Sequence, residues 1–396
     1  MSAPFRVVHA GASEGDVAGS HWSALTRRCL GALAEKGPAS GKPWAGDGGL
    51  GFVYVTDLLG ANLSEVVDHL RLTTGLTHWV GTVGIGILGH EGGGHNGHAA
   101  VEYFDAPAMT VMIADLPGDA FRLFEQQEVG TGAFSKQHGS WIESHDAQLG
   151  LVHGDPRSQR LPAMLESLSD SSGLYLVGGL ASSRGPYALA ADHVAEGGVS
   201  GVMFAGAVTV ATGLSQGCSP IGPIHTITEC DNNIVMMIDE RPALDVFKEE
   251  IGEVLARNLN RAAGYIFAAL PVKASDTGDY LVRNLVGIDP NKGWIAIGDL
   301  VTKDDPILFT RRDKPSAEAD LDRMLSKLKR RIAKPIRGGI YVSCLSRGVN
   351  LFGPDAAETR RINAQLGDFP LVGFFANGEI SHDRLYAHTG VLTLFT

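Results

Sequence analysis

The strand-like segments of this chain are rich in glycine and apolar on both faces, which limits how they can be packed. Residues 51–59 (GFVYVTDLL), 78–89 (HWVGTVGIGILG) and 173–183 (GLYLVGGLASS) follow this pattern, and residues 199–214 predict two more such strands. A strand that is apolar on both faces has to be covered on both faces. The pattern therefore predicts sheets buried under helices, and not a sandwich with one wet face.

Helical segments occur between these strands without one regular β-α-β rhythm. Trp22, Leu25, Cys29 and Leu33 recur at helical spacing, and residues 241–259 predict a helix with a proline in its first turn. The predicted fold class is α/β (α+β), with glycine-rich mixed or antiparallel sheets covered by helices. An αββα-like layering would satisfy this prediction.

Two segments far apart in the chain share one order of elements. Residues 51–89 and 338–381 each predict a strand, a loop, a helix and a second strand with an inner Val-Gly pair, at 80–81 and 372–373. Residues 173–183 echo the first strand of this unit a third time. The similarity is explained either by duplication or by the fact that a strand, loop, helix and strand commonly follow one another in α/β proteins. Duplication would give two related modules with a ligand cleft between them.

The charge balance argues against nucleic acid as a partner. The 396 residues include 33 basic and 44 acidic side chains, a net charge of −11, which repels a polyanion unless a local patch reverses it. The densest basic stretch, residues 327–334, follows apolar residues at helical spacing and is explained as a solvated helix face. The four cysteines are scattered, and neither a signal peptide nor a membrane helix is predicted, so we expect a cytoplasmic protein.

Several ordered motifs resemble the FIST family. Residues 215–247 carry a Gly-Cys-x-Pro-x-Gly turn, a Thr-containing strand, an Asn-bearing hairpin turn and a Pro-Ala helix start, like the end of the family's N-terminal module. Residues 338–353 (GGIYVSCLSRGVNLFG) and 370–381 (PLVGFFANGEIS) are similar to motifs of its C-terminal module. The likeness covers roughly residues 45–395. It implies an N-terminal extension at 1–44, a FIST N-terminal module at 45–240 and a FIST C-terminal module at 241–396.

The resemblance implies a stand-alone, bacterial sensory module for signal transduction. Such a module would bind a small ligand such as an amino acid between its two halves, would act through a signalling partner, and is not expected to be an enzyme. Some relatives bind haem and respond to nitric oxide, so a haem-based sensor is the first alternative. Other relatives carry an F-box, for which the 44 residues before the first module are too short.

The candidate ligand contacts lie in two turns, GCSPIG and NGEIS, and just after two predicted strands, in ASSRG and SCLSRG. The GCSPIG turn offers backbone amides that can cradle an anion. Arg347 after one strand can grip a carboxylate, and Glu379 can accept an amine, so together they would match a zwitterion. A salt bridge between Arg347 and Glu379 is the alternative. The predicted ligand-binding residues are Gly217, Cys218, Ser219, Ser182, Arg184, Cys344, Arg347 and Glu379.

Other chemistries are weaker alternatives. A thiolate at Cys218 with His225 as base and Glu229 as orienter would suit a hydrolase or transferase. The GIGILG segment matches a dinucleotide pattern, but no helix follows it, so we reject NAD binding. The glycine-rich segment 89–98 supplies metal-ligand types, although a flexible loop explains it better. These candidates are His90, Glu91, His95 and His98 for a metal, and Cys218, His225, His78 and His193 for a haem iron.

Overall fold

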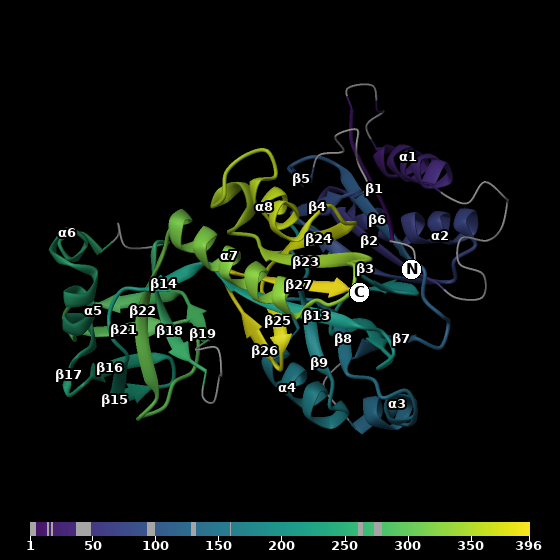
Figure 1. Cartoon of the computed structure of the whole chain (residues 1–396). Helices are drawn as coiled ribbons and strands as arrows, with labels where there is room; N and C mark the ends of the chain where they lie inside the picture. Colours follow the sequence, from purple (N-terminus) through teal and green to yellow (C-terminus); the bar gives the residue numbers. More distant parts are fainter. Residues whose placement is uncertain are drawn as a thin grey trace. The chain divides into compact units, whose positions relative to one another are not determined.

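A computed structural model gives the fold, which divides into two compact units (Figure 1). The first unit comprises Met1–Ser215, Asp322–Leu385 and Thr389–Thr396, and the second comprises Gln216–Leu321 with Tyr386–His388. The first unit thus includes residues from both sides of the module boundary expected near residue 240. The structure describes residues 5–13, 16, 19–36, 49–92, 100–127, 132–158, 160–259, 264–272 and 279–396.

The second unit is a β-sheet that packs on one short helix. Phe247 of that helix meets Phe309 of the sheet at a ring-centroid distance of 5.0 Å, within an apolar core. The helix predicted over 241–259 is interrupted, because Gly252 has a φ of +77° and separates two shorter helices. The elements are β14 (Cys218–Pro220), β15 (His225–Asp231), β16 (Ile234–Ile238), β17 (Arg241–Pro242), α5 (Ala243–Ile251), α6 (Glu253–Ala256), β18 (Ile266–Pro271), β19 (Tyr280–Arg283), β20 (Leu285–Asp289), β21 (Trp294–Ile297) and β22 (Pro306–Arg312).

Within the described residues, the first unit repeats one order of elements three times. Each repeat runs strand, helix, strand, helix, strand, a two-stranded hairpin and a last strand. The first repeat contains β1 (Arg6–Gly11), α1 (His21–Lys36), β2 (Leu50–Thr56), η1 (Asp57–Asn62), α2 (Leu63–Thr74), β3 (His78–Gly84), β4 (Gly86–His90), β5 (Val101–Phe104) and β6 (Ala108–Ala114).

The second and third repeats follow the same order. Most residues of the second unit come in the sequence between β13 and α7 of the third repeat, and that unit also includes residues 314–321 of α7 and Tyr386–His388. The second repeat contains β7 (Phe121–Gln127), α3 (Gly132–Ser144), β8 (Leu149–Gly154), α4 (Leu161–Ser172), β9 (Tyr175–Leu180), β10 (Leu189–Ala191), β11 (His193–Ala195) and β12 (Val199–Phe204). The third contains β13 (Val210–Gln216), α7 (Lys314–Arg331), β23 (Gly338–Cys344), η3 (Gly348–Asn350), α8 (Ala357–Leu366), β24 (Leu371–Ala376), β25 (Glu379–His382), β26 (Arg384–Tyr386) and β27 (Thr389–Phe395).

The hairpin of each repeat completes the sheet of another repeat. The sheet orders in the described residues are β1-β6-β2-β3-β10-β11, β7-β12-β8-β9-β25-β26 and β13-β27-β23-β24-β4-β5. Hairpin β10–β11 of the second repeat therefore extends the first sheet, β25–β26 of the third extends the second, and β4–β5 of the first extends the third. This cyclic exchange ties the three repeats together, so we expect none of them to fold on its own.

Each parallel strand pair has a glycine at the same register position. A Cβ atom on that glycine would lie 1.7 to 2.0 Å from a carbonyl oxygen of the neighbouring strand, so only glycine allows the two backbones to approach. The shared register indicates three copies of one unit, and residues 173–183, matched from sequence to a first strand, contain a second strand instead. The pairs are Gly81 opposite Val53, Gly178 opposite Val152 and Gly373 opposite Tyr341.

The central strands of the three sheets of the first unit are buried on both faces, as their composition predicts. One face of each sheet contributes to a common apolar core, in which Phe52, Leu151 and Ile340 hold equivalent register positions. The other face lies under the helices, where Val53 and Val55 of the first repeat pack. The predicted α/β class with mixed, helix-covered sheets is confirmed.

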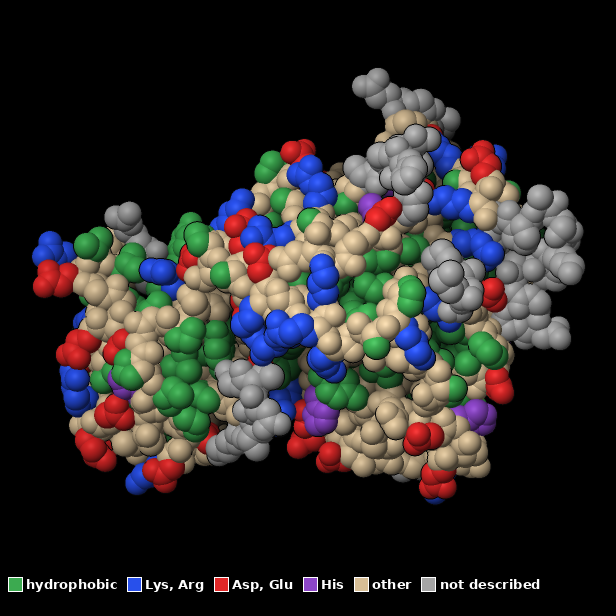
Figure 2. Space-filling model, viewed as in Figure 1, with side chains coloured by type: hydrophobic (Ala, Val, Ile, Leu, Met, Phe, Trp, Pro, Cys, Tyr) green, Lys and Arg blue, Asp and Glu red, His purple; other side chains and the backbone are tan. Residues whose placement is uncertain are grey.

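The basic stretch after residue 321 lies on α7. Its apolar side chains Leu325 and Leu328 are buried, whereas Lys329, Arg330 and Arg331 are exposed. Figure 2 shows Lys and Arg side chains gathered over this region. The alternation is that of a helix with one solvated face, which is the arrangement predicted from the sequence.

Candidate functional site

The layer between sheet and helices is apolar in the first two repeats and polar in the third. Val53 and Val152 hold the register position that Tyr341 holds in the third repeat, and the next outward position there is Ser343. Helix α8 buries Glu358, Thr359 and Ile362, with the spacing at which α2 buries Val66, Val67 and Leu70. Buried charge is costly, so this substitution of polar for apolar side chains marks the third repeat as the functional candidate.

Arg347 is the centre of this polar cluster and is fully buried. Its guanidinium Nη2 lies 2.7 Å from Glu358 Oε1, and its Nε donates to the same oxygen at 2.8 Å. Longer contacts of 3.3 to 3.4 Å join it to Ser215 and to the Tyr341 hydroxyl. The salt bridge of Arg347, considered from the sequence as an alternative with Glu379, is made with Glu358, and the Ser215 and Tyr341 contacts are the weaker ones.

Glu358 is held by donors from three directions. Tyr341 donates its hydroxyl to Oε1 at 2.6 Å, and Ser343 donates to Oε2 at 3.1 Å. The backbone N–H of Gly348 also donates to Oε2, at 2.9 Å. This satisfied carboxylate fixes the segment between β23 and α8 over the cluster (Figure 1).

Glu379 begins β25 and is fully buried near Arg347 and Cys344. Thr389 donates to its Oε2 from its backbone at 3.1 Å and from its hydroxyl at 2.8 Å. Burial raises the pKa of Glu379 to about 8, and the contacts with Thr389, Arg347 and Cys344 oppose this rise only in part. Glu379 therefore keeps its proton to a higher pH than an exposed glutamate does, and a cation brought near it would favour release of that proton to solvent.

We expect Glu379 to make the protein less stable as the pH rises. The unfolded carboxyl group loses its proton near its usual pKa of 4.5, whereas the folded one keeps it until about pH 8. Its contribution to the free energy of unfolding is thus complete below pH 4.5 and is lost as the pH rises towards 8, by a few kcal/mol at about 1.4 kcal/mol per pKa unit. Urea unfolding at pH 5, 7 and 9 should show a smaller fall in Glu379→Gln than in the wild type, and equal falls would contradict the assignment.

Glu102 of β5 adds a second carboxyl group to the edge of the cluster. Its Oε1 accepts from the backbone N–H of Thr359 at 3.2 Å and from the Thr359 hydroxyl at 2.9 Å. Burial, and then the nearby Glu358, raise the pKa of Glu102 to about 7. Two carboxyl groups with raised pKa values thus lie near the Arg347–Glu358 pair, Glu379 near Arg347 and Glu102 near Glu358.

Ser182 and Arg184 follow β9 and lie at strand ends of the first unit. The Ser182 hydroxyl donates to the carbonyl oxygen of Phe375 at 2.5 Å and accepts from the N–H of Ile85 at 2.9 Å. Arg184 binds both oxygens of Asp57, at 2.7 and 2.8 Å, and Oδ1 of Asp105 at 2.7 Å. The structure therefore brings together Arg347, Cys344 and Glu379, links Ser182 to the neighbouring strand β24, and gives Arg184 carboxylate partners of its own.

The GCSPIG residues Gly217, Cys218 and Ser219 belong to the second unit. Cys218 pairs with Arg312 of β22 and His225 pairs with Ile307, which places them roughly 16 Å apart along that strand. His225 faces Asp239 at 2.6 Å and Glu250 at 3.3 Å, whereas Glu229 is exposed. The structure does not bring Cys218, His225 and Glu229 together as a catalytic set.

The proposed metal ligands are only partly within the described residues. His90 bonds to Asp368 at 2.6 Å and Glu91 pairs with Lys36, while His95 and His98 lie outside the described residues. Among the residues that are described, no group of three or more His, Cys, Asp or Glu side chains has metal-binding geometry. A metal at this segment stays a prediction.

The candidate haem ligands are dispersed. His225 lies between its two carboxylates, His78 bonds to Asp192 at 2.8 Å, Cys218 is buried in the second unit, and the His193 side chain is 80% exposed. Haem binding also stays a prediction.

Four residues of the polar cluster were not among the ligand-binding residues predicted from the sequence. Ser215, Tyr341 and Ser343 lie inside the family-like motifs but were not predicted as ligand contacts, and Glu358 lies in an ordinary helix sequence. An alignment of the three repeats could have identified Glu358, because α8 has this acid at the position where α2 has the apolar Val66. The missed residues are Ser215, Tyr341, Ser343 and Glu358.

The fold and the cluster define a class: a three-repeat α/β protein with buried, titratable groups at the strand ends of its last repeat. Family comparison agrees with the sequence motifs, since a FIST N domain matches residues 49–241 and a FIST C domain matches residues 243–382. The chain belongs to the FIST family. FIST domains are associated with the sensing of small ligands in signal transduction.

Mycobacterial proteins are among its relatives. An uncharacterised protein of Mycobacterium tuberculosis strain H37Rv is 32% identical over 311 residues, which covers 74% of this chain and 79% of the relative. An uncharacterised protein of Mycobacterium bovis is 30% identical over 308 residues, with the same coverage of 74% and 79%. No helix in the described part of the chain is long and apolar enough to cross a membrane.

Proposed function

We propose that this chain is a small-ligand-binding sensory protein whose ligand contacts gather around Arg347, Glu379 and Cys344. The observation that carries the proposal is the replacement of apolar by charged and hydroxyl side chains in the layer between sheet and helices of one of three equivalent repeats. The buried carboxylates of the first two repeats, Asp57 and Asp155, lie instead just after β2 and β8 and pair with Arg184 and Arg157. The first two repeats fill this layer with valine and leucine, so the fold itself does not need charges there. Perturbed, buried ionisable groups are typical of functional sites.

The ligand class that fits this cluster is a small zwitterion such as an amino acid. Its ammonium group would pair with the ionised Glu379 carboxylate, and the proton that burial retains there would be released to solvent as the pair forms. Its carboxylate would replace the long contacts of Arg347 with Ser215 and Tyr341, while the short pair with Glu358 stays in place. Catalysis is not part of the proposal.

Access to the cluster would come from movement of the segment between β23 and α8. This segment includes Asp355 and Ala356, which have φ values of +61° and +52° and so lie in a region that non-glycine residues rarely adopt. Arg347 and Gly348 of the same segment contact Glu358 directly. Ligand binding would thereby change the position of a loop, which a signalling partner could detect.

A thermal-shift screen tests the proposed function. Wild-type protein at pH 8 should be stabilised by at least one zwitterionic amino acid, and not by the matched amine or carboxylic acid that lacks the second charge. Glu379→Gln should lose this shift, because a neutral amide binds an ammonium group weakly. Glu249→Gln, at an exposed helix position of the second unit, is the control and should keep it. A shift that survives in Glu379→Gln would contradict the site.

A further inference from the structure

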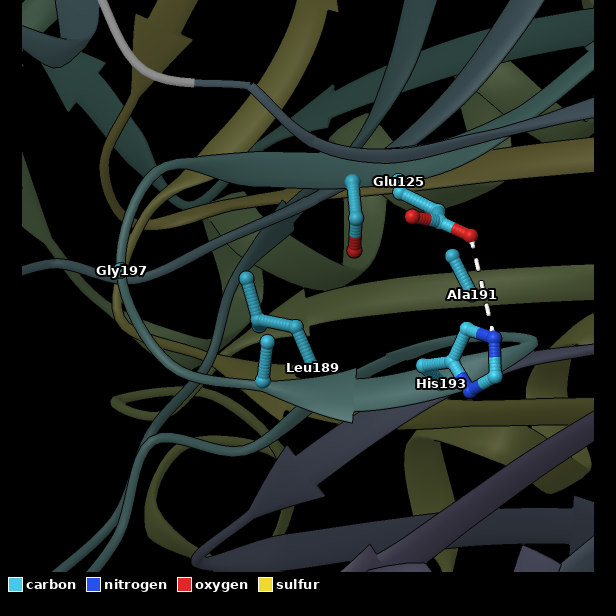
Figure 3. A pocket seen from close by; sticks show the side chains of 7 residues that line it. Glu125, Leu189, Ala191, His193 and Gly197 are labelled. Carbon is cyan, nitrogen blue, oxygen red and sulfur yellow. Dashed lines mark ion pairs between the residues drawn. The ribbon is translucent and has the colours of Figure 1, made fainter.

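A second place in the first unit has the form of a small binding site. Hairpin β10–β11 and strands β7 and β12 enclose a cavity of about 100 Å³ (Figure 3). Leu189, Ala191 and Ala195 form apolar walls. The polar lining consists of Glu125, His193 and Ser200, with Glu125 Oε1 4.0 Å from His193 Nε2. No sequence motif pointed to this cavity.

Ser200 supplies an independent sign of a missing partner. Its side chain is 3% exposed, and its hydroxyl oxygen makes no hydrogen bond to any described residue. A buried hydroxyl without a partner is costly, and this one lines the cavity. Because Glu125 and His193 reach the surface, the cavity combines a buried hydroxyl at one wall with ionisable groups at an exposed edge.

The equivalent place between the third and first sheets shows what the cavity lacks. Hairpin β4–β5 pairs with β24 as β10–β11 pairs with β3, with Leu88 opposite Gly373 and Ala190 opposite Gly81. Counting along the two hairpins from these anchors makes Tyr103 equivalent to Ala195.

The residue that bonds to Tyr103, His9, also has a counterpart at the cavity. His9 follows Val8 in β1 as Glu125 follows Phe124 in β7, and Val8 and Phe124 hold equivalent register positions, with a register shift in β7 just after Phe124. The Tyr103 hydroxyl lies 2.8 Å from His9 Nδ1, so a phenol ring bridges hairpin and edge strand at that place. At the cavity, alanine replaces the tyrosine and a carboxylate replaces the imidazole.

We propose that the cavity binds a small aromatic molecule of phenol size, which takes the position that the Tyr103 ring takes at the equivalent place. The hydroxyl or ring N–H of the ligand donates to the Glu125 carboxylate. Ser200 gives or accepts a second hydrogen bond, and Leu189 and Ala195 contact the ring. An engineered apolar cavity of about 150 Å³ holds benzene, and this smaller cavity is open at the His193 edge, so one ring fits with its edge near solvent. This site is separate from the Arg347 cluster and does not depend on the function proposed there.

Phenol binding to the full-length protein, followed by amide NMR titration, tests the proposal. Wild type should show saturable shifts in β7 and β10–β12, and benzene, which cannot donate, should bind at least tenfold more weakly. Ala195→Tyr should lose phenol binding, because its own ring fills the cavity. Ser200→Ala, which leaves the cavity open, should weaken binding by about two- to tenfold and serves if Ala195→Tyr fails to fold.

The reverse substitution gives a gain of function. Tyr103→Ala should open the equivalent cavity, so the number of phenol molecules bound per chain should rise from one to two. Undiminished binding in Ala195→Tyr would overturn the proposal. So would a wild-type protein that shows no saturable shifts, since the cavity would then hold water only.

Discussion

Gly373→Ala is expected to cost the protein roughly 3 kcal/mol or more of its free energy of unfolding. The new Cβ atom would lie 1.7 Å from the carbonyl oxygen of Tyr341, so β24 would have to move away from β23. Backbone atoms cannot turn aside as a flexible side chain can, and the parallel hydrogen bonds around this position would be lost. Urea unfolding followed by circular dichroism measures the loss.

Two further variants make this expectation specific. Gly81→Ala places a Cβ atom 1.7 Å from the Val53 carbonyl oxygen in the first repeat and should be as harmful. Gly31→Ala in helix α1 meets no atom within 4 Å and should stabilise the protein by about 0.5–1 kcal/mol. If Gly373→Ala were as stable as Gly31→Ala, the close approach of the two strands would be wrong.

Arg347→Met should be the most damaging change to the polar cluster, with an expected loss of about 3–5 kcal/mol. It removes the cation and leaves the Glu358 carboxylate buried beside two hydroxyl groups. Arg361→Met is the matched control, because its pair with Asp322 is about one-third exposed and should contribute no more than about 1 kcal/mol. Thermal and urea unfolding of the two variants compare a buried and an exposed ion pair in one unit.

The double variant Arg347→Met, Glu358→Met tests whether the loss of stability in Arg347→Met comes from the unpaired Glu358 charge or from the loss of the arginine side chain itself. It returns the layer to the apolar character of the first two repeats, so most of the stability lost in Arg347→Met should come back. Ligand-induced stabilisation, by contrast, should not return. A double variant as unstable as the single one would mean that the cluster is required by the fold of the third repeat and is not an addition to it.

The fold class was predictable because its cause is local. Strands such as residues 50–56 are apolar at nearly every position, and a strand of that kind must be covered on both faces. The Val-Gly pairs at 80–81 and 372–373 likewise marked true register equivalents. The third copy was matched to the wrong strand, because glycine-rich strands of similar composition occur at both positions of the unit.

The site was predictable only in part. Arg347, Cys344 and Glu379 were chosen from motifs at strand ends, and the structure places them near one another. The partner of Arg347 was not predictable, since Glu358 lies 11 residues further along and meets it only through the packing of α8 on β23. His225 shows the opposite error, because neighbours in sequence were grouped with it while Asp239 and Glu250 surround it in space.

The sequence by itself determined the α/β class, the family and the strand ends at which polar groups collect, because these follow from local pattern and composition. Tertiary structure alone decided that the repeats number three in the described residues, that each hairpin joins the sheet of another repeat, and that Ala195 stands where Tyr103 stands elsewhere. These features depend on pairing between strands distant in the chain. Strand pairing is set by the total burial of all the sheets, which no single segment encodes.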